Sequence, residues 1–213
     1  MAVHEHPRQS SGFHLPSFRP SSRGNRNASA SEPVAAAQTD THTAPACTLA
    51  SLRLLTGFVF LWAFLDKTFG LGYATASGKG WIDGGSPTKG FLSSVAAGPM
   101  RSAFHSWAGD PWADWLFMLG LLGIGVALVT GVALRFAAVA GTLMMALMWL
   151  AEWPPAKHLA DGSPSMSTNP FADYHVIYAV VLIVLAASSA GDALGLGRTW
   201  AKLPLVRRSR WLR

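Results

Sequence analysis

The chain has 213 residues, of which 50% are hydrophobic and 13% charged, with nine tryptophans and a formal net charge of +6. Soluble domains carry roughly a quarter of charged residues, so this composition argues against a soluble globular protein and favours a membrane protein. A single cysteine excludes an internal disulfide and a CxxC redox pair. We expect the positive charge to meet membrane lipid, with no nucleic-acid partner, because basic and aromatic residues do not alternate on any segment.

The N-terminal segment, residues 1–45, is rich in Ser, Ala, Pro, Arg and His and has no apolar period. Such a segment cannot bury enough surface to offset its chain entropy, which predicts a disordered cytoplasmic tail. We do not expect a cleavable signal peptide, because no apolar stretch precedes Leu49.

A four-helix membrane domain is predicted over residues 46–197, because four segments approach the roughly 20 apolar residues that span a bilayer. The expected transmembrane helices lie at about 49–69, 113–134, 136–153 and 171–191. The outer loop between the first two, 70–112, is long enough to suggest function or structure of its own. Apolar residues recur in it at three- or four-residue spacing, which predicts two short helices half in the membrane interface. The predicted fold is therefore all-α: a polytopic four-transmembrane-helix bundle with short interfacial helices.

Small residues recur every four positions in the second predicted helix, at Gly123, Ala127 and Gly131. This spacing lets helix backbones approach closely in a membrane, so we expect these positions at helix interfaces.

Lysine and arginine mark the cytoplasmic side of a membrane protein. They collect in the C-terminal segment 198–213, expected as a basic cytoplasmic tail, and at Arg135 in the turn between the second and third helices. With an even number of crossings, both termini are then cytoplasmic.

This orientation brings ionisable side chains of several helices to the outer rim of the bundle. Lys67 ends the first helix, Glu152 ends the third, and Asp173 and His175 begin the fourth. Charges beside membrane helices are costly and by default suggest function. We predict a polar pocket in which Glu152, Asp173 and His175 are catalytic; the alternative is that each charge simply lies among lipid headgroups.

Helical phase separates Lys67 from its neighbour Asp66, because Lys67 follows Arg53 by nearly four turns and shares its face. We expect Lys67 to point into the bundle and Asp66 to face a loop or headgroups. Asp192 matches Arg53 in depth at the cytoplasmic end, which predicts a structural ion pair between them.

A quinone headgroup needs a proton donor or acceptor at each carbonyl and flat apolar walls. Lys67, Trp149, Trp153 and Tyr178 are the candidate quinone-binding residues, although an interfacial aromatic belt explains the tryptophans equally well. Haem is disfavoured because only His175 lies within a membrane segment. No metal site is predicted, since Glu152, Asp173 and His175 could supply three ligands but no HExxH or cysteine cluster accompanies them.

Four stretches together resemble the DoxX family of bacterial membrane proteins, in particular its DoxD-like branch. They are FLWAFLDKTFG, GWIDGGSPTKGFL, LLGIGVALVTGVALRFAAVAGTLMMALMWLAEWPP and NPFADYHVIYAVVLIVLAASSAGDALGLGR, and the similarity covers about residues 49–200. The resemblance implies a four-helix bundle in the bacterial inner membrane. It also implies the membrane subunit of a thiosulfate:quinone oxidoreductase, with quinone as electron acceptor, no covalently bound cofactor and a partner subunit or redox protein.

Two other functions remain open. One is a non-catalytic membrane scaffold that recruits redox proteins, favoured by the absence of a redox cofactor motif and by the single cysteine. The other is a small transporter, ranked third because no inverted repeat or broken helix is evident.

Overall fold

The computed structural model describes residues 43–165 and 167–212, and these residues are all helices, turns and loops. The elements are α1 (Ala44–Phe69), η1 (Trp81–Asp83), α2 (Lys89–Ser93), α3 (Arg101–Trp107), α4 (Pro111–Thr130), α5 (Leu134–Glu152), α6 (Tyr174–Ala187), α7 (Gly197–Trp200), α8 (Pro204–Arg208) and η2 (Arg210–Leu212). The described part of the chain has no strand beyond an isolated bridge between His158 and Pro164. The predicted all-α class is confirmed there. The predicted tail 1–45 lies outside the described residues except at its end, where α1 begins.

Three helices, α1, α4 and α5, are long and apolar enough to cross a membrane. The predicted fourth crossing, 171–191, is shorter than expected, because α6 has 14 residues. That length rises roughly 21 Å, against a hydrocarbon core of about 30 Å. The side chain of Asp173 fixes its start by accepting a hydrogen bond from the backbone N–H of Val176, and Ser189 with φ 52° lies just beyond its end. Among the described helices, three rather than four thus have the length of a crossing.

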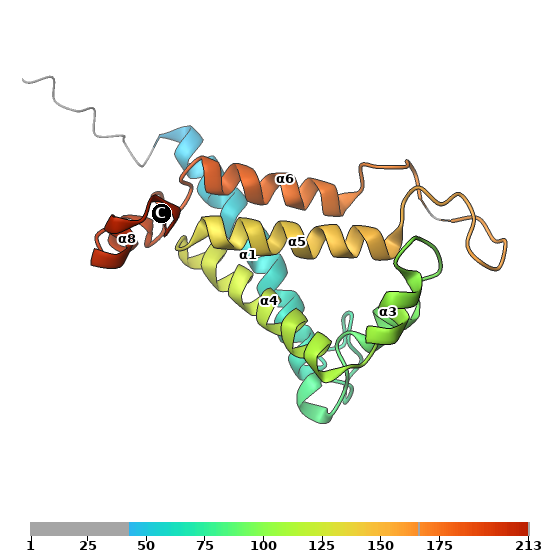
Figure 1. Ribbon diagram of the computed structural model, residues 1–213. Helices are drawn as coiled ribbons and strands as arrows, with labels where there is room; N and C mark the ends of the chain where they lie inside the picture. The colour runs from blue at the N-terminus through green and yellow to red at the C-terminus, as the bar shows by residue number, and fades with distance from the viewer. Residues whose placement is uncertain (1–42, 166, 213) are drawn as a thin grey trace, which may run out of the picture. The chain divides into compact units, whose positions relative to one another are not determined.

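The long helices pack in chain order: α1 against α4, α4 against α5, and α5 against α6, which also touches α1 (Figure 1). Their common core holds Phe60, Met118, Leu128, Leu182 and Leu185, all at most 3% exposed. Arg53, in the first half of α1, and Glu152, at the end of α5, lie toward opposite ends of the helix bundle.

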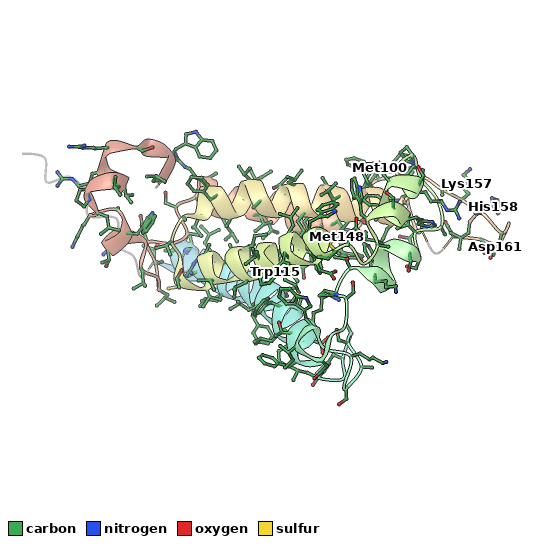
Figure 2. All side chains as sticks on the ribbon, turned by 60° about the horizontal axis from the view of Figure 1, so that its bottom comes forward. Met100, Trp115, Met148, Lys157, His158 and Asp161 are labelled. Carbon is green, nitrogen blue, oxygen red and sulfur yellow. The ribbon has the colours of Figure 1, made fainter. Side chains whose placement is uncertain are left out.

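The outward faces of these helices are also apolar, as the carbon-only sticks along them show (Figure 2). Exposed large hydrophobic side chains include Leu55, Leu116, Leu119, Leu143 and Ile177, each at least 56% exposed. Contiguous apolar surface of this kind is rare on soluble monomers, whereas acyl chains cover it in a membrane. The composition and the fold therefore agree on a helical membrane protein.

Two glycines let α1 and α4 approach each other. A Cβ at Gly57 would lie 2.9 Å from Leu128 Cβ and 3.0 Å from the backbone N of Val129, and one at Gly125 would meet Leu61. The interface expected at Gly123 is wrong, since nothing lies within 4 Å of its Cβ position.

The outer loop contains the two predicted short helices, α2 and α3. Val95, Phe104 and Ala151 form a small buried cluster, so this part of the loop is fixed to the end of α5. The buried carboxylate of Asp114 holds the preceding stretch, accepting hydrogen bonds from the hydroxyls of Ser86 and Thr88 and from the N–H of Thr88. That α2 and α3 lie in the membrane interface remains a prediction.

The C-terminal segment is folded rather than a mere tail. α7 begins at Gly197, one residue before the predicted boundary, and Val206 of α8 is 1% exposed. The Trp211 ring packs edge-on against Phe136 of α5, with 5.9 Å between ring centroids. The segment thus contains structure that contacts α5, and the domain boundary at 197 stays a prediction.

Candidate functional site

The Arg53 guanidinium is fully buried, and it bonds backbone carbonyls. Its five N–H donors reach the carbonyl oxygens of Leu128, Val129, Ala190, Ala193 and Leu194. The first two belong to the last turn of α4, where carbonyls lack helical partners and the helix dipole favours a cation. The other three follow α6.

The predicted ion pair between Arg53 and Asp192 is therefore wrong in the described structure. Asp192 is exposed, and every donor of Arg53 is already used by a carbonyl. Arg53 therefore ties α1 to the end of α4 and to the segment that follows α6, because it bonds carbonyls of both.

The Asp66-Lys67 pair separates as predicted, with Lys67 toward the bundle and Asp66 toward the loop. Asp66 is 1% exposed, and its Oδ1 accepts a hydrogen bond from the N–H of Tyr73 in the loop that covers it. Of the two surroundings expected for Asp66, a loop or headgroups, the structure shows the loop. Lys67 points toward α4, with Nζ 5.9 Å from the ring centroid of Phe117, a cation–π contact. No contact joins Lys67 to Glu152, Asp173 or His175 within the described residues.

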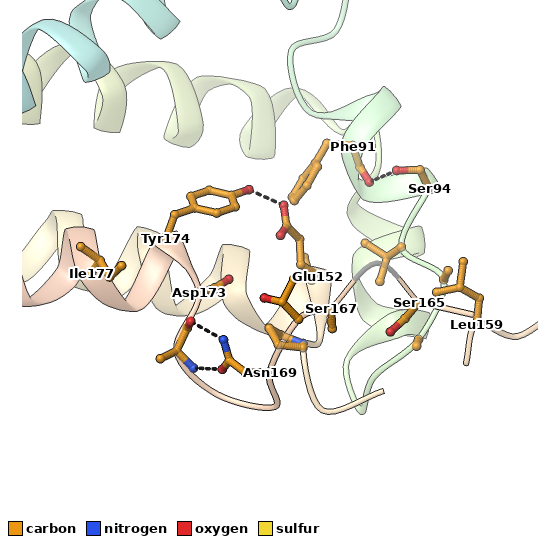
Figure 3. A pocket seen from close by; sticks show the side chains of 17 residues that line it. Phe91, Ser94, Glu152, Leu159, Ser165, Ser167, Asn169, Asp173, Tyr174 and Ile177 are labelled. Atoms are coloured by element: carbon orange, nitrogen blue, oxygen red, sulfur yellow. Dashed lines mark hydrogen bonds between the residues drawn. The ribbon is translucent and has the colours of Figure 1, made fainter. Parts of the chain in front are cut away.

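Glu152, Asp173 and His175 do come together at the junction of α5 and α6. Nδ1 of His175 lies 2.8 Å from Oδ2 of Asp173 and 3.9 Å from Oε2 of Glu152. The hydroxyl of Tyr174 donates to Oε1 of Glu152 at 2.5 Å (Figure 3). We call these four residues the His175 cluster.

Asp173 has two roles, one with each oxygen. Oδ1 accepts from the N–H of Val176 and caps α6, while Oδ2 pairs with Nδ1 of His175. A carboxylate oxygen accepts, so the pairing places the ring hydrogen on Nδ1 and leaves Nε2 for other partners. Nε2 has no hydrogen-bond partner, although His175 is 1% exposed. The cluster thus presents a buried, oriented imidazole with one free nitrogen.

An apolar pocket of about 370 Å³ lies between α5 and α6, and His175 forms part of its wall. Trp149 and Phe171 also line it; the indole N–H of Trp149 donates to the Phe171 carbonyl, which fixes the ring. The volume is within the usual range of about 300 to 1,000 Å³ for small-molecule sites. We call this space the α5–α6 pocket.

A second, larger hollow of about 590 Å³ lies on the other side of the His175 cluster. Glu152, Asp173 and Tyr174 line it with hydroxyl and amide side chains of the loop between α5 and α6 (Figure 3). The described residues that line it include no lysine or arginine. Because its acidic side chains include two carboxylates, it favours water, protons and cations over anions. We call it the acidic hollow.

The structure brings some of the predicted quinone residues to one place and separates the others. Trp149 lines the α5–α6 pocket with His175, and Trp153 stacks edge-on against Trp149 with 5.4 Å between centroids. Tyr178 instead packs in the core against Phe60 of α1, at 6.4 Å. Lys67 lies against α4, as described above.

Two features of the cluster are missing from the sequence-based prediction. The capping role of Asp173 was readable, because an aspartate directly before an apolar run is a helix-start signal. The bond from Tyr174 to Glu152 was not, because it joins two helices across 22 positions.

A cation could bridge the cluster in principle, since donor atoms of Glu152, Asp173 and His175 lie within 4.8 Å of one another. The groups already satisfy one another, however, through the His175–Asp173 and Tyr174–Glu152 hydrogen bonds. The absence of a metal site stays a prediction.

No family model, no curated protein and no solved structure matches this chain. The residues of the site place a buried imidazole between an apolar pocket and an acidic hollow, an arrangement suited to general acid–base chemistry.

Proposed function

We propose that this chain is the membrane subunit of a quinone-linked oxidoreductase and that the α5–α6 pocket takes the quinone headgroup. The observation that carries the proposal is His175, whose Nδ1 is held by Asp173 while Nε2 is unpaired in the wall of an apolar pocket. Trp149 and Phe171 supply the flat walls that a quinone ring needs.

Reduction of a quinone consumes two electrons and two protons, and the His175 cluster is suited to supply the protons. Protonated His175 donates from Nε2 to a carbonyl oxygen, and Asp173 stabilises the imidazolium that forms before each transfer. The acidic hollow, with Glu152 at its edge, gives a route by which protons are replaced. Oxidation of a quinol uses the same groups in reverse.

The resemblance to the DoxX family suggests thiosulfate as the electron source. Two thiosulfate ions joined by a new S–S bond give tetrathionate and release the two electrons that quinone takes. A dianion is disfavoured beside Glu152 and Asp173, and the single cysteine offers no dithiol to carry the electrons. We therefore assign oxidation of the sulfur compound to a partner subunit and quinone chemistry to this chain.

The test measures thiosulfate-dependent quinone reduction in membranes that contain the chain and its partners. Glu152→Gln and His175→Ala should each lower the rate about tenfold or more, since general acid–base groups contribute roughly 10²- to 10⁴-fold. The control is Asp161→Asn, in the loop that extends beyond the helices (Figure 2). Unchanged rates in both cluster variants would show that the assignment is wrong.

The scaffold alternative is separated by a second measurement. A scaffold needs only its contacts with partners, so His175→Ala would leave the rate unchanged while removal of the chain abolishes it. The quinone proposal requires His175→Ala to lose activity while the complex still assembles, as checked by co-purification of the partners.

A further inference from the structure

Three buried side-chain polar atoms in the described chain have no hydrogen-bond partner: Oδ2 of Asp66, Oγ1 of Thr142 and Nε2 of His175. Two of the three, Thr142 on α5 and His175 on α6, line the same α5–α6 pocket. An unpaired polar atom in an apolar setting is destabilising, because it has lost its hydrogen bonds to water without replacement. Both atoms lie beneath the apolar wall of this pocket, where side-chain rotations bring them to a ligand with two polar groups.

Thr142 also differs from the other threonines of the long helices. Those others each donate their hydroxyl to the carbonyl four residues earlier: Thr48 to Ala44, Thr56 to Leu52, Thr68 to Phe64 and Thr130 to Val126. That bond is the ordinary way to satisfy a hydroxyl in an apolar helix. Thr142 lies in the same kind of helix without it, so its hydroxyl is unpartnered and a rotation about χ1 is what would turn it toward a ligand.

The register of α5 against α6 gives the distance between the two atoms. The contact of Gly141 with Leu182 and the bond of Glu152 to Tyr174 place His175 opposite about residues 148 to 151 of α5. Thr142 is six to nine residues away, or roughly 9 to 14 Å at 1.5 Å per residue. Two hydrogen bonds of about 2.8 Å leave roughly 3 to 8 Å for the ligand. A single six-membered ring with oxygens at opposite ends falls in this range.

We propose that Thr142 is a specificity-determining residue that donates a hydrogen bond to the second carbonyl of a para-quinone whose first carbonyl meets His175. This inference rests on the proposed quinone function and sharpens it, because it names the ligand class: a ring with two oxygens in para positions. Thr142 does not enter the proton chemistry; it orients the ring and discriminates against rings with one oxygen.

The experiment measures binding of tritium-labelled decylubiquinone and of 4-decylphenol, a one-oxygen ring, to the purified full chain in nanodiscs, with empty discs subtracted. Thr142→Val keeps the shape and removes the hydroxyl, and Thr142→Ser keeps the hydroxyl. The matched control is Thr130→Val, the same change at a threonine whose hydroxyl bonds its own helix. Thermal unfolding of each variant checks that the fold is intact.

We expect Thr142→Val to weaken quinone binding about three- to tenfold, the value of one neutral hydrogen bond. It should leave phenol binding unchanged, and Thr142→Ser and Thr130→Val should bind quinone like the parent. If the parent binds quinone and Thr142→Val binds it equally well, the role of Thr142 is overturned while the quinone function stands. If the parent binds no quinone above empty discs, both are overturned.

Discussion

His175 connects the His175 cluster to the α5–α6 pocket. Asp173 holds its Nδ1, and its Nε2 has no partner. Asp173 holds it while also capping α6. A short polar side chain at the start of a helix therefore orients a side chain two residues later. This coupling of cap and cluster makes Asp173 a positioning residue whose two roles can be separated by substitution.

Asp173→Asn and Asp173→Ala provide that separation. Asparagine caps a helix as well as aspartate, so Asp173→Asn should keep stability, whereas Asp173→Ala should lose about 1 kcal/mol. Both should lower quinone-linked turnover about tenfold or more, because neither can hold an imidazolium. Thermal unfolding and turnover are measured on the same preparations. Wild-type turnover in Asp173→Asn would show that the carboxylate has no positioning role.

At Arg53, the number of donors matters more than the charge. Lysine has three donors against five, so Arg53→Lys leaves at least two carbonyls unpaired and should destabilise by about 1 to 3 kcal/mol. Asp192→Asn should change stability by no more than about 0.5 kcal/mol, because Asp192 is exposed and does not meet Arg53. The measurement is unfolding in detergent. If Asp192→Asn lowered the free energy of unfolding as much as Arg53→Lys does, the predicted ion pair between the two residues would be supported after all.

At the scale of helices, α1 approaches α4 closely at Gly57. A methyl group there would press on the backbone of Val129 and on Leu128. Gly123 on α4 has the same residue type and no neighbour within 4 Å. The two positions make a matched pair that separates interface packing from helix propensity.

Gly57→Ala should destabilise the chain by about 1 to 3 kcal/mol through overpacking. Gly123→Ala should be neutral or stabilising by up to about 1 kcal/mol, since alanine favours a helix more than glycine does. Unfolding of both variants under identical conditions is the check. Equal effects at the two sites would contradict the close α1–α4 approach.

The sequence was informative about helices and less so about their contacts. Apolar runs placed α1, α4 and α5 within a few residues, because length and composition follow directly from the lipid environment. The shortness of α6 depends on the cap at Asp173 and the turn after Ala187, which an apolar run does not reveal. Four-residue spacing identified the contact at Gly131, which lies against Gly191, but not those of Gly57 and Gly125, whose partners are on the facing helix.

The site was predictable to the extent that it is local. Glu152, Asp173 and His175 flank one connection between consecutive helices, so matching their depth brought them together correctly. The same reasoning placed Lys67 and Tyr178 in the site, where the structure does not show them, because depth in the membrane does not say which neighbour a side chain faces. The prediction for Arg53 was wrong because it considered side-chain partners alone, although every helix end also has free backbone carbonyls.

For the whole molecule, the number of crossings decides which side each loop lies on. If α6 and its flanking turns cross the membrane, Lys157 and Lys202 lie on opposite sides; if they do not, both lie on one side. Both residues are exposed, and Cys47 is the single cysteine to remove first.

In a Cys47→Ser background, Lys157→Cys should react with a membrane-impermeant maleimide from outside intact cells. Lys202→Cys should react only in inverted vesicles, as the basic C-terminal segment requires. Permeabilised cells control for reactivity. Labelling of both positions from the same side would show that α6 does not cross.

The most direct test of the account is to map where a quinone binds. A photoreactive azido-quinone is cross-linked to the purified chain in nanodiscs, and the labelled peptides are found by mass spectrometry. The account predicts adducts on α5 between residues 142 and 150 and on the stretch 171–180 around His175, lost with excess decylubiquinone and reduced in His175→Ala. Labelling confined to other helices, or labelling that excess quinone does not displace, would contradict it.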